Sequence, residues 1–289
     1  MQRLAILLTC HNRRDATLRC LAAVHAADPV AGLSIHVVLV DDGSTDGTGD
    51  EVGRRFPNVQ IIRGDGTLFW AGGMRLALSE ALREDYDFYL FLNDDTTMDR
   101  DAIARLMATY ATCRVAGCDG TVVGTTRDPL TGRATYGGLR RASWWRPLKL
   151  DLVPPGEEPI ECDTMNTNFA LVPRSVVSHV GNLDATFTHR IADVDYGFRV
   201  RRAGFKNWVM PGTIGLCAND HRVEGTWCDS TLPLRTRLTN LMSPKGLNLH
   251  EWRVFTRRHA GPLWFVFWLS PYAKVFVSAL ISGRRNGSS

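Results

Sequence analysis

The first hundred residues alternate short apolar runs with helical patterns, and this feature constrains the fold most. Strand-like runs occur at 4–9, 35–40, 59–62 and 88–92, and helix-like stretches at 16–27 and 71–82. Strands that alternate with helices form βαβ crossovers and build a mostly parallel sheet flanked by helices. We therefore expect an α/β fold with its ligands at the carboxyl ends of the strands.

Further along the chain this alternation is lost and then returns. Five prolines interrupt the stretch 121–171, where we expect irregular loops and antiparallel strands over the site. A helical pattern at 194–203 and a strand pattern at 205–210 follow. Beyond residue 230 the chain becomes basic and then aromatic, so we expect a separate helical extension there.

Composition places the chain among ordinary globular proteins. Of its 289 residues 44% are hydrophobic and 22% charged. The first residues lack the pattern of a secretion signal and predict a strand instead. The seven cysteines are an odd number without a CxxC pair, which argues against a disulfide framework or a structural zinc site. We expect reduced thiols, a cytoplasmic location and no nucleic-acid partner.

Two acidic residues follow the second strand-like run, in the sequence LVDDGSTDGT. Asp41 and Asp42 stand at the expected strand end, before a Gly-Ser turn. A carboxylate at this place can accept hydrogen bonds from a ribose or a base. Dinucleotide binding would require a GxGxxG turn after the first strand, and residues 9–13 read TCHNR instead. The pattern therefore argues against a dinucleotide site.

Another polar cluster ends the strand-like run 88–92, in the sequence FYLFLNDDTT. It consists of Asn93, Asp94 and Asp95. Mg²⁺ and Mn²⁺ prefer oxygen ligands and bind through one or two carboxylates, while water and substrate phosphates complete the shell. We expect Asp95 to bind Mn²⁺ or Mg²⁺, and Asn93 or Asp94 to contact a ribose or a metal-bound water.

The segment 64–75, GDGTLFWAGGMR, is rich in glycine. Gly72 and Gly73 stand near the start of the expected helix, where backbone N–H groups can approach a phosphate, and Arg75 adds positive charge. The alternative is a glycine pair that only packs the helix closely, beside a solvated arginine.

Together these motifs resemble the GT-A-fold glycosyltransferases of family 2, which are inverting and use nucleotide sugars. In that family the first strand ends in a Thr-x-x-Asn-Arg-like turn, matched here by Thr9, Asn12 and Arg13, and a block like LVDDGSTDGT follows. The resemblance extends over roughly residues 1–220. It implies that Thr9 and Asp42 face the nucleobase with Asp41 nearby.

Two further segments are similar to family motifs with substitutions. Asp65 stands in the family's Asn-x-Gly turn, and Arg75 lies near the place of a later Asn. The resemblance makes both residues donor-binding candidates.

The stretch 189–204, HRIADVDYGFRVRRAG, resembles the family's ED block. Asp193 matches the general base, and a carboxylate can take the proton of an acceptor hydroxyl. Ala192 replaces the family's glutamate, so we expect Asp195 to substitute for it in part. His221 matches a histidine that reaches the metal or the diphosphate in many relatives. A helix N-cap is the alternative role of Asp193.

The resemblance implies a GT-A domain over 1–230, with a nucleotide-binding half at 1–120 and an acceptor half at 121–230, and a basic helical extension over 231–289. The acceptor half contains aromatic and amide side chains that are candidates for acceptor contacts. These are Tyr136, Trp144, Trp145, Asn166 and Asn168.

The extension combines positive charge with aromatic residues. From Thr231 onward the sequence has nine basic residues and one acidic residue, so the formal charge of this part is +8 and that of the preceding part is −4. Within 261–282, one helical face holds Trp264, Trp268, Tyr272, Val275 and Ala279. Such a segment suits a helix in the membrane interface, so we expect peripheral contact with the inner face of the plasma membrane. Core packing, a homodimer and a membrane span are the alternatives.

We therefore expect an inverting hexosyl- or deoxyhexosyltransferase that uses a nucleotide-diphosphate sugar and a glycan or lipid-linked glycan acceptor. A sugar nucleotidyltransferase is a second hypothesis. Enzymes of that class have a Gly-rich basic loop after the first strand, and TCHNRRD does not match it. A non-catalytic nucleotide-sugar-binding protein is a third. Asp42, Asp95, Asp193 and His221 are all present, which argues against a decayed site.

Overall fold

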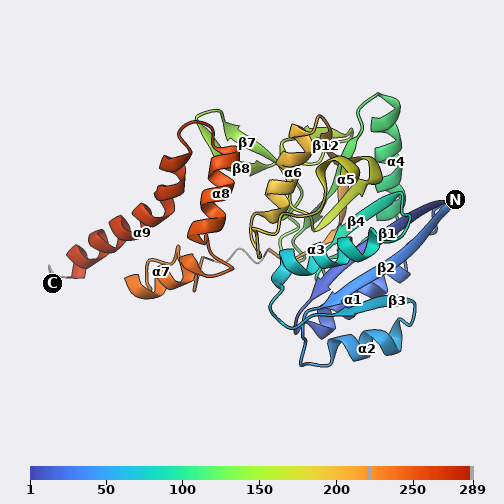
Figure 1. Ribbon diagram of the computed structural model, residues 1–289, viewed down its shortest axis with the longest axis horizontal. Coiled ribbons are helices and arrows are strands. Elements are labelled where there is room, and N and C mark those ends of the chain that lie inside the picture. The colour runs from blue at the N-terminus through green and yellow to red at the C-terminus, as the bar shows by residue number, and fades with distance from the viewer. Residues whose placement is uncertain (220–222, 287–289) are drawn as a thin grey trace. The chain divides into compact units, whose positions relative to one another are not determined.

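The computed structural model describes residues 1–219 and 223–286, with side chains as far as Ser278 (Figure 1). Its internal contacts divide the chain into two units. The first unit comprises Met1–Arg140, Asp151–Thr188 and Ala192–Ala218, and the second comprises Arg141–Leu150, His189–Ile191 and Asn219–Ser289.

A large mixed sheet forms the centre of the first unit. Its strand order is β3-β2-β1-β4-β11-β6-β12-β5, and β9 pairs with β12. The strands are β1 (Gln2–Cys10), β2 (Leu33–Asp41), β3 (Val59–Arg63), β4 (Phe88–Leu92), β5 (Thr97–Met98), β6 (Gly120–Arg127), β9 (Ile160–Cys162), β11 (Phe169–Pro173) and β12 (Lys206–Leu216). Six of these, β1 to β4, β6 and β12, run in one direction. The expected α/β class and mostly parallel sheet are confirmed.

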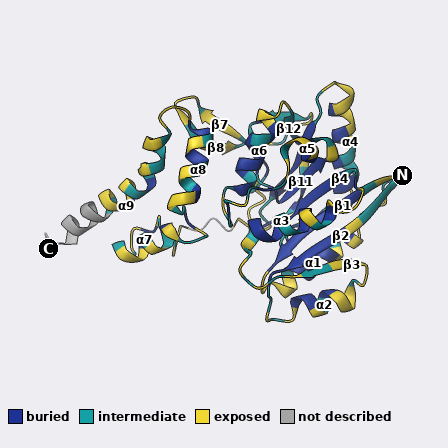
Figure 2. Ribbon diagram, viewed as in Figure 1, coloured by how far each residue is buried: buried dark blue, intermediate teal, exposed yellow. Residues whose placement is uncertain are grey.

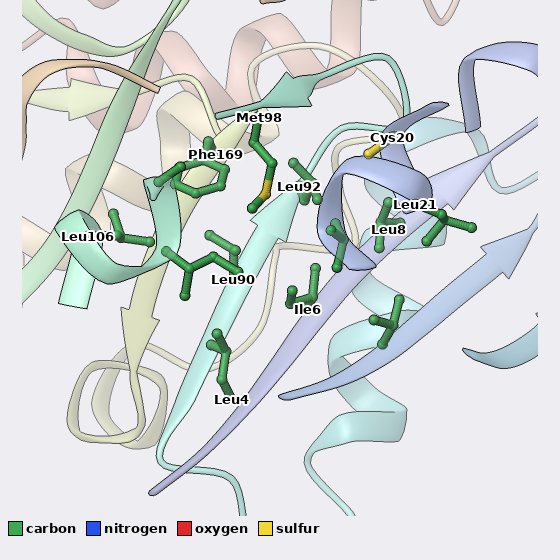
Figure 3. Packing of buried hydrophobic residues seen from close by; sticks show 14 of the residues in the cluster. Leu4, Ile6, Leu8, Cys20, Leu21, Leu90, Leu92, Met98, Leu106 and Phe169 are labelled. Carbon is green, nitrogen blue, oxygen red and sulfur yellow. The ribbon is translucent and has the colours of Figure 1, made fainter. Parts of the chain in front are cut away.

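Helices cover both faces of this sheet. They are α1 (Arg14–His25), α2 (Thr48–Arg55), α3 (Phe69–Ala81), α4 (Ala102–Val115), α5 (Arg174–Val180) and α6 (Ala192–Arg202). Successive side chains of β1 point to opposite faces, so Ile6 and Leu8 pack in one core with Leu21 of α1 (Figure 3), and Leu7 packs in the other with Met74 of α3. A strand buried on both faces has a continuous apolar sequence, which explains the run at 4–8.

The second unit is built from a hairpin tip and helices. Strands β7 (Gly138–Ser143) and β8 (Arg146–Leu152) join β10 (Thr164–Met165) in a small sheet of order β10-β7-β8. The hairpin tip, residues 141–150, belongs to the second unit. The helices of this unit are α7 (Leu234–Met242), α8 (Leu249–His259) and α9 (Trp264–Asn286).

The aromatic face of α9 packs inside its own unit. Trp268 Nε1 donates to the Leu249 carbonyl at 3.1 Å, and the Tyr272 hydroxyl donates to the Leu247 carbonyl at 2.7 Å. Val275 of the same face is buried. Two residues of the face that we expected at a membrane, Trp268 and Tyr272, therefore contact the start of α8 and the loop before it. Within the described part of the chain, no helix has the length and apolarity to cross a bilayer.

Candidate active site

Asn12 joins the ends of β1 and β2. Its backbone adopts φ 51°, a left-handed conformation that asparagine tolerates better than most residues. Its Oδ1 accepts from the Thr45 N–H at 2.7 Å, and its own N–H donates to Ser44 Oγ at 3.0 Å. The turn after β2 is thereby fixed against the end of β1.

Asp41 is buried at the end of β2 and holds this turn from the other side. Its Oδ1 accepts from the Ser44 N–H at 3.1 Å, and its Oδ2 accepts from Arg63 Nη1 at 2.9 Å. Arg63 also pairs with Asp50, so it ties β3 to α2. The sequence analysis did not single out Arg63.

Asp42 shapes the loop that leads from β3 into α3. Its Oδ1 accepts from the Gly66 N–H at 2.9 Å and its Oδ2 from the Phe69 N–H at 3.0 Å. Phe69 has φ 53°, so the carboxylate holds it in a conformation that a bulky side chain rarely adopts. In the same loop the exposed carboxyl of Asp65 accepts from the N–H and hydroxyl of Thr67, and these hydrogen bonds lower the pKa of Asp65.

Arg13 bridges the two carboxylates at the end of β4. Its Nη1 lies 3.2 Å from Asp94 Oδ1, and its Nη2 lies 2.7 Å from Asp95 Oδ2. Asp94 is 4% exposed and also accepts from Thr17 Oγ1 at 3.3 Å. Burial raises the pKa of Asp94 to about 7, although Arg13 opposes this shift. The strand end thus places two carboxyls side by side, and a cation bound there would favour the ionised form of both.

Asn93 and Asp95 have partners from distant parts of the chain. Trp70 Nε1 of α3 donates to Asn93 Oδ1 at 2.8 Å, which fixes the orientation of this amide. Cys217, just after β12, lies 3.5 Å from Asp95 Oδ1, and its sulfur is also 3.5 Å from Asn168 Nδ2. The sequence carried no signal for Trp70 or Cys217, because their roles depend on contacts between remote segments.

Asp193 is the second residue of α6 and lies half-buried beside the loop between β10 and β11. Its Oδ2 accepts from Asn166 Nδ2 at 3.4 Å, and its Oδ1 accepts from the Val194 N–H at 2.8 Å. Burial raises the pKa of Asp193, and these hydrogen bonds oppose that rise. A carboxyl with a raised pKa is a stronger base once it has lost its proton, which is the property that proton abstraction needs.

Asp195 has a structural pairing. It is fully buried, and its Oδ2 accepts from Arg199 Nε at 2.8 Å one turn later in α6. Arg199 also donates to the carbonyls of Val180 and Asn182. This pairing joins Asp195 to the packing between α5 and α6. That Asp195 in part replaces the acid missing at Ala192 stays a prediction.

Thr9 of β1 and Arg75 of α3 belong to two elements that pack against each other. A Cβ added to Gly73 would lie 2.0 Å from Thr9 Oγ1, so glycine permits this close approach. Arg75 Nη1 is buried and has no hydrogen-bond partner. A buried guanidinium N–H without a partner retains its full capacity to bind an anionic oxygen.

The remaining candidate residues lie in several different parts of the chain. Asn166 and Asn168 lie in the loop beside Asp193, whereas Trp144 and Trp145 belong to the second unit. The carbonyl of Tyr136 accepts from the Thr126 N–H in the first unit. His221 lies outside the described residues.

The donor set at the end of β4 suits a divalent cation that is shared with a substrate. In the described ranges, no group of three or more His, Cys, Asp or Glu residues could enclose a metal ion. Two adjacent carboxylates, Asp94 and Asp95, are the hard oxygen donors that Mg²⁺ and Mn²⁺ accept when phosphate oxygens and water supply the other ligands. The positive Arg13 guanidinium at the same carboxylates shows that the position favours cationic charge.

Gly197 sets how closely α6, and with it Asp193, approaches β10. A Cβ at this position would lie 2.3 Å from Thr164 Oγ1 and 2.9 Å from Thr164 Cα. We expect Gly197→Ala to lower the free energy of unfolding by about 1–3 kcal/mol through overpacking. Thermal unfolding measures this loss. Gly53→Ala is the matched control, because there an added Cβ meets its nearest neighbour at an ordinary 3.6 Å. Equal melting temperatures for the two variants would contradict the packing argument.

Comparison with known proteins identifies the class. Residues 5–180 match the family model described as glycosyl transferase family 2, so the chain belongs to this family. A curated relative from Mycobacterium tuberculosis, an N-acetylglucosaminyl-diphospho-decaprenol L-rhamnosyltransferase, is 25% identical over 204 residues, which is 61% of this chain and 64% of the relative. An N-acetylglucosaminyltransferase of Azorhizobium caulinodans is 29% identical over 44% of this chain and 32% of the relative. The matches span less than two thirds of these relatives.

Solved structures show the same GT-A fold. The mannosyltransferase PcManGT of Pyrobaculum calidifontis, in complex with GDP-Man and Mn²⁺, has a TM-score of 0.57 at 16% identity, over 99% of this chain and 76% of that one. S. aureus TarS in complex with UDP-GlcNAc has a TM-score of 0.55 at 13% identity, over 89% of this chain and 71% of that one. The sequence-based expectation of family and fold is confirmed.

Proposed function

We propose that this chain is an inverting glycosyltransferase that moves a sugar from a nucleotide-diphosphate donor to a glycan or lipid-linked glycan. The observation that carries this proposal is Asp193, a half-buried carboxyl with a raised pKa, which accepts a hydrogen bond from Asn166 in the same unit as the acidic end of β4. Family membership supplies the reaction class.

In the proposed reaction Asp193 acts as the general base. Its carboxylate removes the proton of the acceptor hydroxyl while that oxygen attacks the anomeric carbon. The bond between the anomeric carbon and the diphosphate oxygen breaks, and the nucleoside diphosphate departs with the electron pair. A single displacement inverts the anomeric centre and needs no covalent sugar intermediate.

The donor's nucleotide end is proposed to bind where β1 and β2 end. Thr9, Asn12, Asp41, Asp42 and Asp65 gather there, as described above. Since Asp41 and Asp42 already hold the surrounding loops, their main effect is to keep the binding surface in shape. On the diphosphate side, Arg75 and Arg13 supply positive charge and Asn93 contacts the ribose.

Asp95 is proposed to hold Mn²⁺ or Mg²⁺, with Asp94 beside it and His221 as a second ligand. When bound, such a cation stabilises the negative charge that develops on the leaving diphosphate. Arg13, which pairs with Asp95 Oδ2, would be free to pair with the donor phosphates if a cation took its place at that carboxylate.

The acceptor is proposed to be presented at a membrane. The rhamnosyltransferase relative is named for a lipid-linked acceptor, a diphospho-decaprenol. The basic segment 231–289 would bring this chain to the same kind of surface, with peripheral contact through 261–282 at the cytoplasmic face of the plasma membrane. A homodimer remains an alternative use of that segment.

A thermal-shift screen tests donor binding. We expect one nucleoside diphosphate, or its sugar, to raise the melting temperature with Mn²⁺ present and to raise it less with EDTA, because a ligand that binds only the folded state stabilises it. Asp28→Ala, at an exposed carboxyl paired with Arg100, is a control that keeps the shift. A full panel of nucleoside diphosphates without any shift would contradict the proposed donor site.

A further inference from the structure

Exposed positions recur along the described part of α9 (Figure 2). Several large apolar residues are among them, and they share one side of the helix. We call it the α9 outer face. It consists of Phe265, Val266, Leu269, Ala273, Phe276 and Val277. At 100° per residue these positions fall within an arc of about 120°, and between Phe265 and Val277 no charged residue falls in this arc. Leu269 and Phe276 are each 49% exposed and Val277 is 54% exposed. The outer face lies opposite the face that packs against α8.

Two exposed tryptophans lie in the same unit. Trp144 and Trp145, at the tip of the β7–β8 hairpin, are 90% and 61% exposed. Arg141 Nη2 of this hairpin donates to the His259 carbonyl at 3.1 Å, which holds the hairpin to the end of α8, just before α9. The Arg146 guanidinium stacks on Trp145 at 5.4 Å from the ring centroid. Indole rings beside arginines are typical of the boundary between lipid and water.

The charge of the second unit is strongly positive. Its sequence contains fourteen Lys and Arg against four Asp and Glu, a formal charge of +10, which leaves −6 for the first unit. Lys274 of α9 and Arg253 and Arg257 of α8 are exposed. An apolar helix face on a strongly positive unit complements a surface with anionic headgroups over an apolar interior.

We propose that the α9 outer face, together with Trp144 and Trp145, is a docking surface for an anionic lipid bilayer. The proposal rests on the peripheral membrane contact proposed above and assigns it to a different set of residues. Trp268 and Tyr272 hold α9 to the rest of its unit, while Leu269 and Phe276 enter the acyl boundary and the basic side chains contact lipid phosphates.

Vesicle flotation of the full chain tests this surface. Vesicles of phosphatidylcholine mixed with phosphatidylglycerol should carry the native chain upward at low salt and less of it at high salt, and vesicles of phosphatidylcholine alone should carry little.

The double variant Leu269→Glu with Phe276→Glu should reduce the bound fraction about tenfold or more, because two apolar side chains that would be buried in the bilayer are lost. Trp144→Ala with Trp145→Ala should reduce it less. Leu130→Glu, at a side chain that is 93% exposed in the first unit, is the matched control.

Circular dichroism should show that the double glutamate variant is folded. Binding of that variant to anionic vesicles at the native level would overturn the proposal, and so would a native chain that does not float. A native dimer that the double variant turns into a monomer, with flotation unchanged, would assign the face to a second copy instead. Flotation requires neither donor nor acceptor. Its failure is therefore distinct from failure of the transferase proposal, which the nucleotide thermal shift reports.

Discussion

Replacement of Asp193 by asparagine should reduce sugar transfer by about a hundredfold or more, since general-base catalysis commonly contributes ~10²–10⁴ in rate. Asparagine has nearly the same shape and still accepts a hydrogen bond from the Val194 N–H, so the fold and the approach of α6 to β10 should persist. The asparagine amide cannot, however, take the proton of the acceptor hydroxyl. Nucleotide binding should stay within a few fold of the native value, because Asp193 is not among the proposed donor contacts.

The pH dependence of turnover gives an independent check of the same residue. Burial raises the pKa of Asp193, and the base acts only when deprotonated. Turnover should therefore fall as pH decreases through a midpoint above the usual aspartate value of about 3.9. Turnover of Asp193→Asn above about a tenth of the native value would remove the assignment of this residue as the base.

Asp95→Ala should weaken metal-dependent donor binding by about tenfold or more, because a carboxylate ligand is lost from a site with few protein ligands. Calorimetry with Mn²⁺ and the nucleoside diphosphate found in the thermal screen measures the change. Without metal the affinities of the variant and the native chain should differ less. His221→Ala should act in the same direction, and excess Mn²⁺ should partly restore binding.

Asp28→Ala is the matched control for the loss of one carboxylate, since Asp28 is exposed and pairs only with Arg100 among the salt bridges of the described residues. It should bind donor and metal as the native chain does. If both Asp95→Ala and His221→Ala also do so, the metal lies elsewhere.

Strands β1 and β4 could be predicted from the sequence because burial on both faces leaves a continuous apolar run. Strand β6 was not predicted, because it lies in the proline-interrupted stretch where we expected irregular loops and antiparallel strands, and it runs parallel to β12. β4 (Phe88–Leu92) begins and ends as expected. Helix α4 (Ala102–Val115) was not predicted, because its buried face includes Thr109, Tyr110 and Cys113, which obscure the apolar period.

The site could be predicted only where a short motif carries it. The acids of β2, β4 and α6 lie at element ends, as expected for this fold. Their partners Trp70, Arg63 and Cys217 could not be predicted, since each contact joins segments far apart in the chain.

The orientation of α9 also required the structure. Because of its aromatic residues, we expected the face with Trp264 and Trp268 to contact the membrane. Indole and phenol groups can instead pack inside a protein when a carbonyl accepts a hydrogen bond from them. Trp268 and Tyr272 find such carbonyls at Leu249 and Leu247. The smaller apolar side chains therefore remain outside.

The central claim is tested most directly by identifying the nucleotide product. The chain should be incubated with Mn²⁺, bacterial membranes as acceptor and the nucleotide sugar chosen by the thermal screen, and the products separated by ion-exchange chromatography. We predict release of nucleoside diphosphate together with sugar bound to the lipid fraction, and loss of both with Asp193→Asn. Nucleoside triphosphate formed on addition of pyrophosphate, with no sugar in the lipid or glycan fraction, would contradict the account and identify a nucleotidyltransferase.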